Sequence, residues 1–150
     1  MECRPLRAHL RGLGQVSEAD RPVAWRWVPP HLAVTWHGRL IERFGGAPGL
    51  RDAGLLESAL ARPRNLVGYS ETVTTERLAA LYGVGLTKAH AFLDGNKRIA
   101  FAVMVAFLKA HGHHLDATED DATRVMLDVA AGGIAEEELE RWIVAHCRLV

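Results

Sequence analysis

The feature that most constrains the fold is an apolar run that lacks a polar face. Residues 97–111, KRIAFAVMVAFLKAH, place apolar side chains on all sides of a helix. Such a helix has to be enclosed by other elements, so we expect it to be the central buried helix. Its uninterrupted apolar part, residues 99–108, is well short of the about 20 residues that span a bilayer. No other run reaches that length, so no membrane span is predicted.

Apolar residues recur at helical spacing in several other segments. Asp52 is a good N-cap for one of them, and Pro63 should end it. Residues 64–74 then favour a short hairpin or an extended loop. The remaining helices are expected over residues 31–44, 75–90, 118–131 and 135–147. The sum predicts an all-α fold, a bundle of about six helices with at most one small hairpin.

Bulk composition restricts the function classes. A chain of 150 residues is long enough for one domain with a real core. Its formal net charge of zero argues against a general binder of nucleic acids or membrane surfaces. Two cysteines near opposite ends form no disulfide framework, so a reduced, cytoplasmic setting is expected. The first residues lack the uninterrupted apolar core of a secretory signal.

The amino-terminal segment is poorly patterned. Residues 1–24 hold scattered Arg, Gly and Pro with no sustained period. We expect them to form an appendage or a disordered arm. The folded domain should therefore occupy residues 25–150.

Polar groups gather in one short stretch between two apolar helices. Residues 90–98 read HAFLDGNKR. Gly95 and Asn96 lie at the mouth of the next helix, where unpaired N–H groups and the helix dipole attract anions. Gly95 lets the backbone approach a phosphate closely, and Lys97 and Arg98 add full charges on the first turn. The helix entrance is therefore interpreted as a phosphate cradle.

Two further side chains extend this interpretation. The Asp94 carboxylate would repel a phosphate unless a cation stood between them, a role that suits Mg²⁺. The His90 imidazole can take a proton from a hydroxyl near neutral pH. Base, metal and cradle together indicate phosphoryl or nucleotidyl transfer. An ordinary helix–loop–helix turn remains the alternative, because Asp-Gly and Gly-Asn are common turn pairs.

The stretch resembles the signature of the Fic/Doc family, H-x-F-x-[D/E]-[G/A]-N-[G/K]-R. Residues 45–63, GGAPGLRDAGLLESALARP, are also similar to the segment before the signature in Doc-type members. WRWVPP, near residue 25, resembles the start of such proteins. The likeness covers about residues 25–146 and leaves residues 1–24 outside.

The resemblance implies an all-α Fic fold and a nucleotide-dependent transferase that acts on a protein hydroxyl. By that implication His90 is the general base and Asp94 holds Mg²⁺. Residues 64–72 would be the flap that aligns the target as an added strand. The residues that would bind the nucleotide phosphates are Gly95, Asn96, Lys97 and Arg98.

Two departures bear on which group is transferred. AMP-transferring members usually carry Gly in place of Lys97, and a second Arg in place of Phe101. This pattern is similar to Doc toxins, which transfer the γ-phosphate of ATP to elongation factor Tu and stop translation. AMP transfer and a catalytically silent binding module remain the alternatives.

Two further features of the sequence bear on regulation and on metal binding. Many Fic proteins carry an inhibitory helix with the pattern [S/T]-x-x-x-E-[G/N], to which residues 72–77, TVTTER, come closest without matching. That absence fits a toxin restrained by a separate antitoxin. His111, His113 and His114 invite a metal site, but histidines after a helix end are far more often structural.

Overall fold

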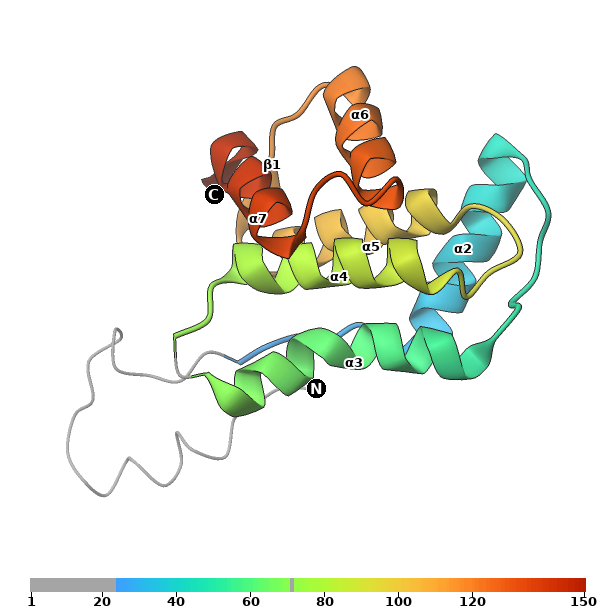
Figure 1. The fold of residues 1–150 in the computed structure, drawn as a ribbon, viewed down its shortest axis with the longest axis horizontal. Coiled ribbons are helices and arrows are strands. Elements are labelled where there is room, and N and C mark those ends of the chain that lie inside the picture. Colours follow the sequence, from blue (N-terminus) through green and yellow to red (C-terminus); the bar gives the residue numbers. More distant parts are fainter. Residues whose placement is uncertain (1–23, 71) are drawn as a thin grey trace.

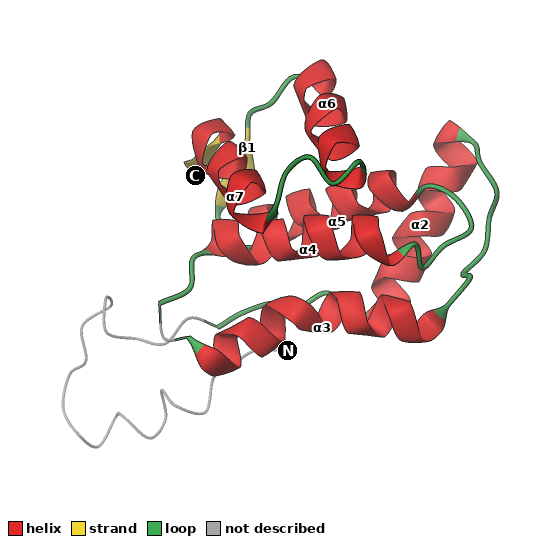
Figure 2. Ribbon diagram, in the orientation of Figure 1, coloured by secondary structure: helices red, strands yellow, loops and turns green. Residues whose placement is uncertain are grey.

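The computed structural model describes residues 24–70 and 72–150 of the chain. Six helices and a two-stranded sheet make up this part (Figures 1 and 2), so the predicted all-α fold class is confirmed. None of these helices is long and apolar enough to cross a membrane. The elements are α2 (Pro30–Phe44), α3 (Ala53–Tyr69), α4 (Thr75–Ala89), α5 (Asn96–Ala110), β1 (His113–Leu115), α6 (Glu119–Ala130), α7 (Glu136–His146) and β2 (Cys147–Leu149).

Two helices form the centre of the bundle, rather than the one that was predicted. Helix α4 packs against α3, α5, α6 and α7, with α3 on one side and α6 and α7 on the other (Figure 1). Every α4 residue from Leu78 to Thr87 is buried. Helix α5 is buried along Ile99, Val103 and Phe107, but the Phe101 side is only half-buried. The all-round apolar pattern thus marked a central helix but missed its more enclosed neighbour.

Two glycines allow α4 to lie this close to its neighbours. A Cβ on Gly83 would come within 3.0 Å of Leu139 of α7 and of Met104 of α5. A Cβ on Gly85 would sit 3.6 Å from the Ala59 carbonyl of α3. The two glycines therefore permit close packing of α4 against α3, α5 and α7.

Helix α3 continues through Pro63, which was expected to end it. Pro63 is buried inside the helix and cannot donate a hydrogen bond to the Ala59 carbonyl. The helix nonetheless runs on to Tyr69, because Leu66 and Val67 pack against the core. The hairpin or extended loop predicted over residues 64–74 is therefore wrong for residues 64–69. The predicted N-cap is confirmed, since the Asp52 side chain accepts from the Leu55 N–H.

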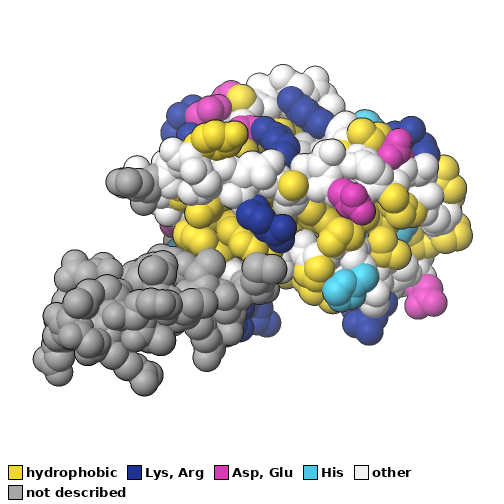
Figure 3. Space-filling model, turned by 90° about the horizontal axis from the view of Figure 1, so that it is seen from below, with side chains coloured by type: hydrophobic (Ala, Val, Ile, Leu, Met, Phe, Trp, Pro, Cys, Tyr) yellow, Lys and Arg dark blue, Asp and Glu magenta, His cyan; other side chains and the backbone are white. Residues whose placement is uncertain are grey.

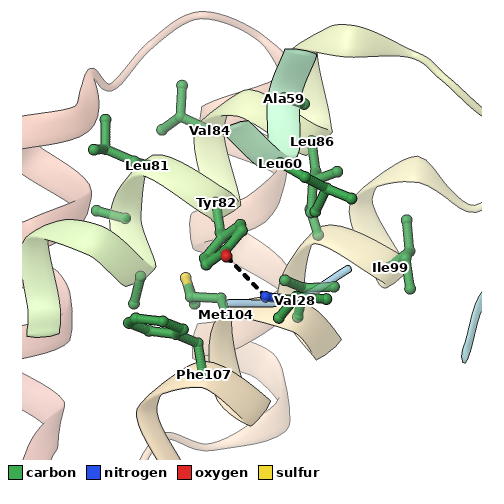
Figure 4. Packing of buried hydrophobic residues seen from close by; sticks show 14 of the residues in the cluster. Val28, Ala59, Leu60, Leu81, Tyr82, Val84, Leu86, Ile99, Met104 and Phe107 are labelled. Carbon is green, nitrogen blue, oxygen red and sulfur yellow. Dashed lines mark hydrogen bonds between the residues drawn. The ribbon is translucent and has the colours of Figure 1, made fainter. Parts of the chain in front are cut away.

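The segment before α2 is tied into the core. The Val28 N–H donates to the hydroxyl of Tyr82, which lies beside Phe107 and Met104 in the core (Figure 4). Burial raises the pKa of that hydroxyl. Trp25 stacks on Phe107 with ring centroids 6.1 Å apart. The predicted extension over residues 1–24 lies outside the described residues, apart from residue 24.

His111 also holds this segment, and its hydrogen bonds define its protonation state. Its Nε2 accepts from the Arg26 N–H at 3.1 Å, while its Nδ1 donates to the Phe107 carbonyl at 2.8 Å. Only a neutral imidazole can do both. Burial is the main cause of a lowered His111 pKa, and the positive charges of Arg26 and His113 lower it further.

Acidification should therefore weaken the hydrogen bond that His111 Nε2 accepts from the Arg26 N–H. Because folding lowers this pKa, the unfolded chain binds more protons below the ordinary value of about 6.5. The contribution to stability is full above that pH and falls as pH drops toward the folded pKa. Urea unfolding, followed by tryptophan fluorescence, measures the free energy of unfolding. Between about pH 7.5 and about pH 5.5, this free energy should fall less for His111→Gln than for wild type. An equal fall in both would contradict this role. His114→Gln, at an exposed position, is the control.

Candidate functional site

Residues 90–95 connect the two central helices, and all predicted site residues lie in this loop or in the first turn of α5. His90 is the C-cap of α4 and has a left-handed backbone, with φ 49° and ψ 45°. Gly95 is the N-cap of α5, also left-handed, with φ 73°. The His90, Asp94, Lys97 and Arg98 side chains are exposed. The loop therefore presents a base, a carboxylate and two cations to solvent at one end of the bundle (Figure 1).

The Asp94 carboxylate is held in its ionised form. Its Oδ2 accepts from the Ala47 N–H at 3.1 Å, and its Oδ1 accepts from the Gly95 N–H at 2.7 Å. These two hydrogen bonds are the main reason that its pKa is lowered, and Arg98 and Lys97 lower it further. A negative carboxylate at pH 7, with lone pairs left on both oxygens, suits a hard divalent cation.

Asp94 is the one carboxylate of the loop, and Mg²⁺ can be held by one carboxylate. The described residues contain no group of three or more His, Cys, Asp or Glu that could enclose a metal ion. Of the three histidines after α5, His111 and His113 contact backbone carbonyl oxygens, those of Phe107 and His111. A single carboxylate such as Asp94 would share the cation with water and phosphate oxygens, which is how Mg²⁺ is commonly bound.

The side chain of Asn96 braces the loop from within. Its Oδ1 accepts from the Phe92 N–H at 3.1 Å, and its Nδ2 donates to the Phe92 carbonyl at 3.0 Å. Both bonds fix the loop before α5 begins. A contact between Asn96 and a nucleotide phosphate stays a prediction, as do those of Gly95, Lys97 and Arg98.

Arg98 connects the cradle to the end of α2. Its Nη1 donates to the Gly45 carbonyl at 3.1 Å, and its guanidinium lies 5.3 Å from the centre of the Phe44 ring. The first N–H groups of α5 have no intrahelical partner. They and the charged groups of the first turn make this helix entrance suitable for a phosphate.

His37 supports the loop from behind, and sequence reasoning missed it. It is buried in α2, and its Nε2 lies 2.7 Å from the Asp94 carbonyl oxygen, to which it donates. Its ring stacks on Phe92 with centroids 3.9 Å apart. A signal was available, because His37 falls between Ala33 and Ile41 at the i, i+4 spacing of the buried face. A polar residue on such a face has to find a buried partner.

The segment that lies beside the loop is residues 45–52, and not residues 64–72. Leu50 and Phe92 form an isolated antiparallel bridge, and the Leu93 N–H donates to the Gly49 carbonyl at 3.1 Å. Residues 64–69 belong to the far end of α3, away from the loop (Figure 1). The flap expected over residues 64–72 is therefore wrong for residues 64–69, because Val67 and Tyr69 belong to α3.

Gly46 offers a way to test the position of Asp94. An added Cβ would lie 2.8 Å from Asp94 Oδ2, so Gly46→Ala should displace the carboxylate. We expect Mg²⁺-dependent ATP binding, measured by calorimetry, to weaken about 10- to 100-fold. Gly45→Ala is the matched control, because Gly45 also has a positive φ but its Cβ would meet nothing within 4 Å. Equal effects of the two variants would assign the loss to backbone strain instead.

A cavity of about 640 Å³ lies at the other end of α4, between α3, α7 and the connection before α4. Its arginines are already paired: Arg62 with Glu136, and Arg77 with Glu140 at 3.1 Å. Because these pairs occupy the cations, the cavity is poorly suited to a phosphate. Residues 72–77, TVTTER, the closest match to the inhibitory pattern, lie here and not beside the loop. The lining includes Arg62, Asn65, Leu66, Ser70, Thr72, Val73, Thr74, Arg77, Leu81, Glu136, Glu137 and Glu140.

Over residues 27–108, the chain matches the sequence model of the Fic/DOC family. It belongs to the Fic/DOC family. The match runs from just before α2 almost to the end of α5 and so contains all of residues 90–98, the loop and the first turn of α5. The resemblance noted from the HAFLDGNKR stretch is thereby confirmed.

Two known proteins are similar in sequence to this chain. The chain is 33% identical over 87 residues to the protein kinase doc of Escherichia phage P1. It is 40% identical over 90 residues to the toxin Doc of Mycolicibacterium smegmatis. Each alignment covers 58% of this chain and 69% of the relative. Within the Fic/DOC family, the chain is therefore similar to Doc proteins.

Proposed function

We propose that this chain is a Doc-like toxin of a toxin–antitoxin pair. It transfers the γ-phosphate of ATP to a Ser or Thr hydroxyl of a protein, for which elongation factor Tu is the first candidate, and so inhibits translation. The observation that carries the chemistry is the entrance of α5. There a left-handed Gly95 opens a helix whose first turn holds Lys97 and Arg98, beside an ionised Asp94.

Each charged or basic residue of the site would have its own role in the transfer. The Nε2 or Nδ1 of His90 accepts the proton of the attacking hydroxyl, whose oxygen forms a bond to the γ-phosphorus. The bond from that phosphorus to the bridging oxygen breaks, and ADP leaves. Lys97, Arg98 and the first N–H groups of α5 stabilise the negative charge. Mg²⁺ on Asp94 would neutralise phosphate charge and orient the nucleotide.

Two features favour phosphate transfer over AMP transfer. Lys97 stands where AMP-transferring members usually have Gly, and Phe101 stands where they usually have a second Arg. Phe101 is half-buried on α5 and offers no charge to hold phosphates in the orientation for AMP transfer. The name of one relative, protein kinase doc, points the same way. AMP transfer is the second candidate, and a silent binding module the third.

The surroundings of the loop suit a protein substrate and a protein inhibitor. Phe44, Leu50 and Leu93 are large hydrophobic side chains that stay 57%, 39% and 59% exposed near the cradle. Hydrophobic side chains are also exposed on the α3 side, with charged ones among them (Figure 3). Such surfaces favour protein partners. We therefore propose a separate antitoxin as a partner. The zero net charge favours no nucleic-acid or membrane partner, and the two cysteines favour a cytoplasmic setting.

The experiment that tests this function uses ATP labelled on the α- or on the γ-phosphate. Each sample is incubated with Mg²⁺, the protein and elongation factor Tu, or with a cell lysate. Label from the γ-phosphate alone supports the proposal, whereas label from the α-phosphate would make the chain an AMP transferase. Label on a lysate protein but not on the factor would keep the chemistry and change the target. No label in any sample would favour the silent binding module.

A further inference from the structure

His90 is held in a backbone conformation that side chains with a Cβ rarely adopt. Among the described residues it is the only one other than glycine with a positive φ. A C-cap in this conformation is usually glycine. The left-handed turn swings the chain out of α4 and determines where the His90 side chain points. Something in the structure has to keep the chain in this turn.

The side chain of Arg51 closes on this turn. Its Nε and Nη2 both donate to the His90 carbonyl oxygen, at 2.8 Å and 2.5 Å. The backbone continues the contact, since the N–H groups of Arg51 and Asp52 donate to the Ala91 carbonyl at 2.7 Å and 3.0 Å. Residues 51 and 52 therefore hold two successive carbonyls just after the proposed base.

We propose that Arg51 is a positioning residue for His90, an inference that rests on the proposed function of His90 as the base. The guanidinium fork presents parallel donors in a rigid plane, so two charge-assisted bonds fix the carbonyl in direction as well as in place. The backbone bonds to Ala91 survive any substitution except proline. A change of the side chain therefore removes the hold on His90 and leaves the pairing of the segment intact.

Arg51 acts through the backbone and not on the nucleotide. The edge of the guanidinium that carries Nε and Nη2 faces the His90 carbonyl. A residue that merely stabilised the fold would lower the melting temperature. A residue that bound phosphate would raise the KM for ATP. Substitution of a residue that positions the base should lower kcat, with little change in the melting temperature or in the KM for ATP.

The test compares Arg51→Gln, Arg51→Lys and a control, Arg124→Gln, at an exposed position on α6. Two quantities are measured: the kinetics of transfer from labelled ATP, and the intraresidue NOE between the amide and α protons of His90. That NOE is strong only at positive φ. A misplaced catalytic group costs on the order of 100-fold, so Arg51→Gln should lower kcat by about 100-fold. Arg51→Lys, which keeps the charge but not the fork, should lose about 10-fold.

The outcomes separate this inference from the proposed function. A weakened His90 NOE in Arg51→Gln, together with the fall in kcat, supports the positioning role. An unchanged NOE would overturn it, and so would an unchanged kcat or a loss confined to KM. If the wild-type protein transfers no label, the proposed function fails. The NOE then decides alone whether Arg51 holds the His90 backbone.

Discussion

Replacing His90 with alanine is expected to lower the rate of phosphoryl transfer by about 10²- to 10⁴-fold, because the attacking hydroxyl loses its general base. The side chain is exposed at the end of α4, so the fold should be unchanged. Initial rates with labelled ATP measure the effect, and circular dichroism verifies folding. The KM for ATP should change little, since the proposed role of His90 is on the hydroxyl and not on the phosphates.

The control is His31→Ala, at an exposed position in the first turn of α2. It should retain the wild-type rate. If His90→Ala also retained that rate, the base would lie elsewhere. Residues 90–98 would then form only a binding site or an ordinary turn before α5.

The second large effect is expected from Asp94→Asn, which keeps the shape of the side chain but removes its charge. Transfer should fall by at least about 100-fold, because the carboxylate that would hold Mg²⁺ is lost. Without Mg²⁺, however, the same variant should bind ATP more tightly than wild type, because a negative charge beside the phosphates is gone. Calorimetry with Mg²⁺ and with a chelator measures both effects.

Asp128→Asn, at an exposed position on α6, is the control for Asp94→Asn. Its ATP binding should match wild type under both conditions. Weaker binding of ATP by Asp94→Asn in the chelator would contradict the role of Asp94 as a cation ligand. It would instead show that the carboxylate contacts the nucleotide directly.

The lowered pKa of Asp94 defines the pH range in which its carboxylate could bind Mg²⁺. Hydrogen bonds from Ala47 and Gly95 keep the carboxylate ionised below its ordinary range. The ionised Asp94 therefore stabilises the folded state above the pKa that this carboxyl group has in the unfolded chain. This stabilisation is lost as pH falls through the lower pKa of the folded state. The charge that would bind Mg²⁺ should persist throughout the neutral and mildly acidic range.

Helices with regularly spaced apolar residues were the part of the fold that the sequence predicted well. The segment expected over residues 75–90 is α4, Thr75–Ala89, and the segment expected over residues 31–44 is α2, Pro30–Phe44. Local periodicity and capping are properties of neighbouring residues, so they can be read without tertiary information. The loop of residues 90–98 was found for the same reason, since its chemistry is contiguous.

Features that depend on distant partners could not be found in this way. Helix α3 passes Pro63 because Leu66 and Val67 reach the core, which local rules do not foresee. Strand β1 was missed because it has only three residues and pairs with β2 from the far end of the chain. Arg51 was expected to be part of a family-like segment, but its bond to the His90 carbonyl joins residues 39 positions apart.

The central claim is that nucleotide phosphates bind at the entrance of α5, and NMR mapping of Mg²⁺–ATP tests it most directly. Backbone amide shifts of the labelled protein are followed as Mg²⁺–ATP is added, with Mg²⁺ alone as the reference. We expect the largest changes at the amides of residues 94–98, with smaller ones at residues 45–47. Changes centred instead on the cavity lined by Arg62, Arg77 and Glu140 would contradict the claim and move the nucleotide to the other end of α4.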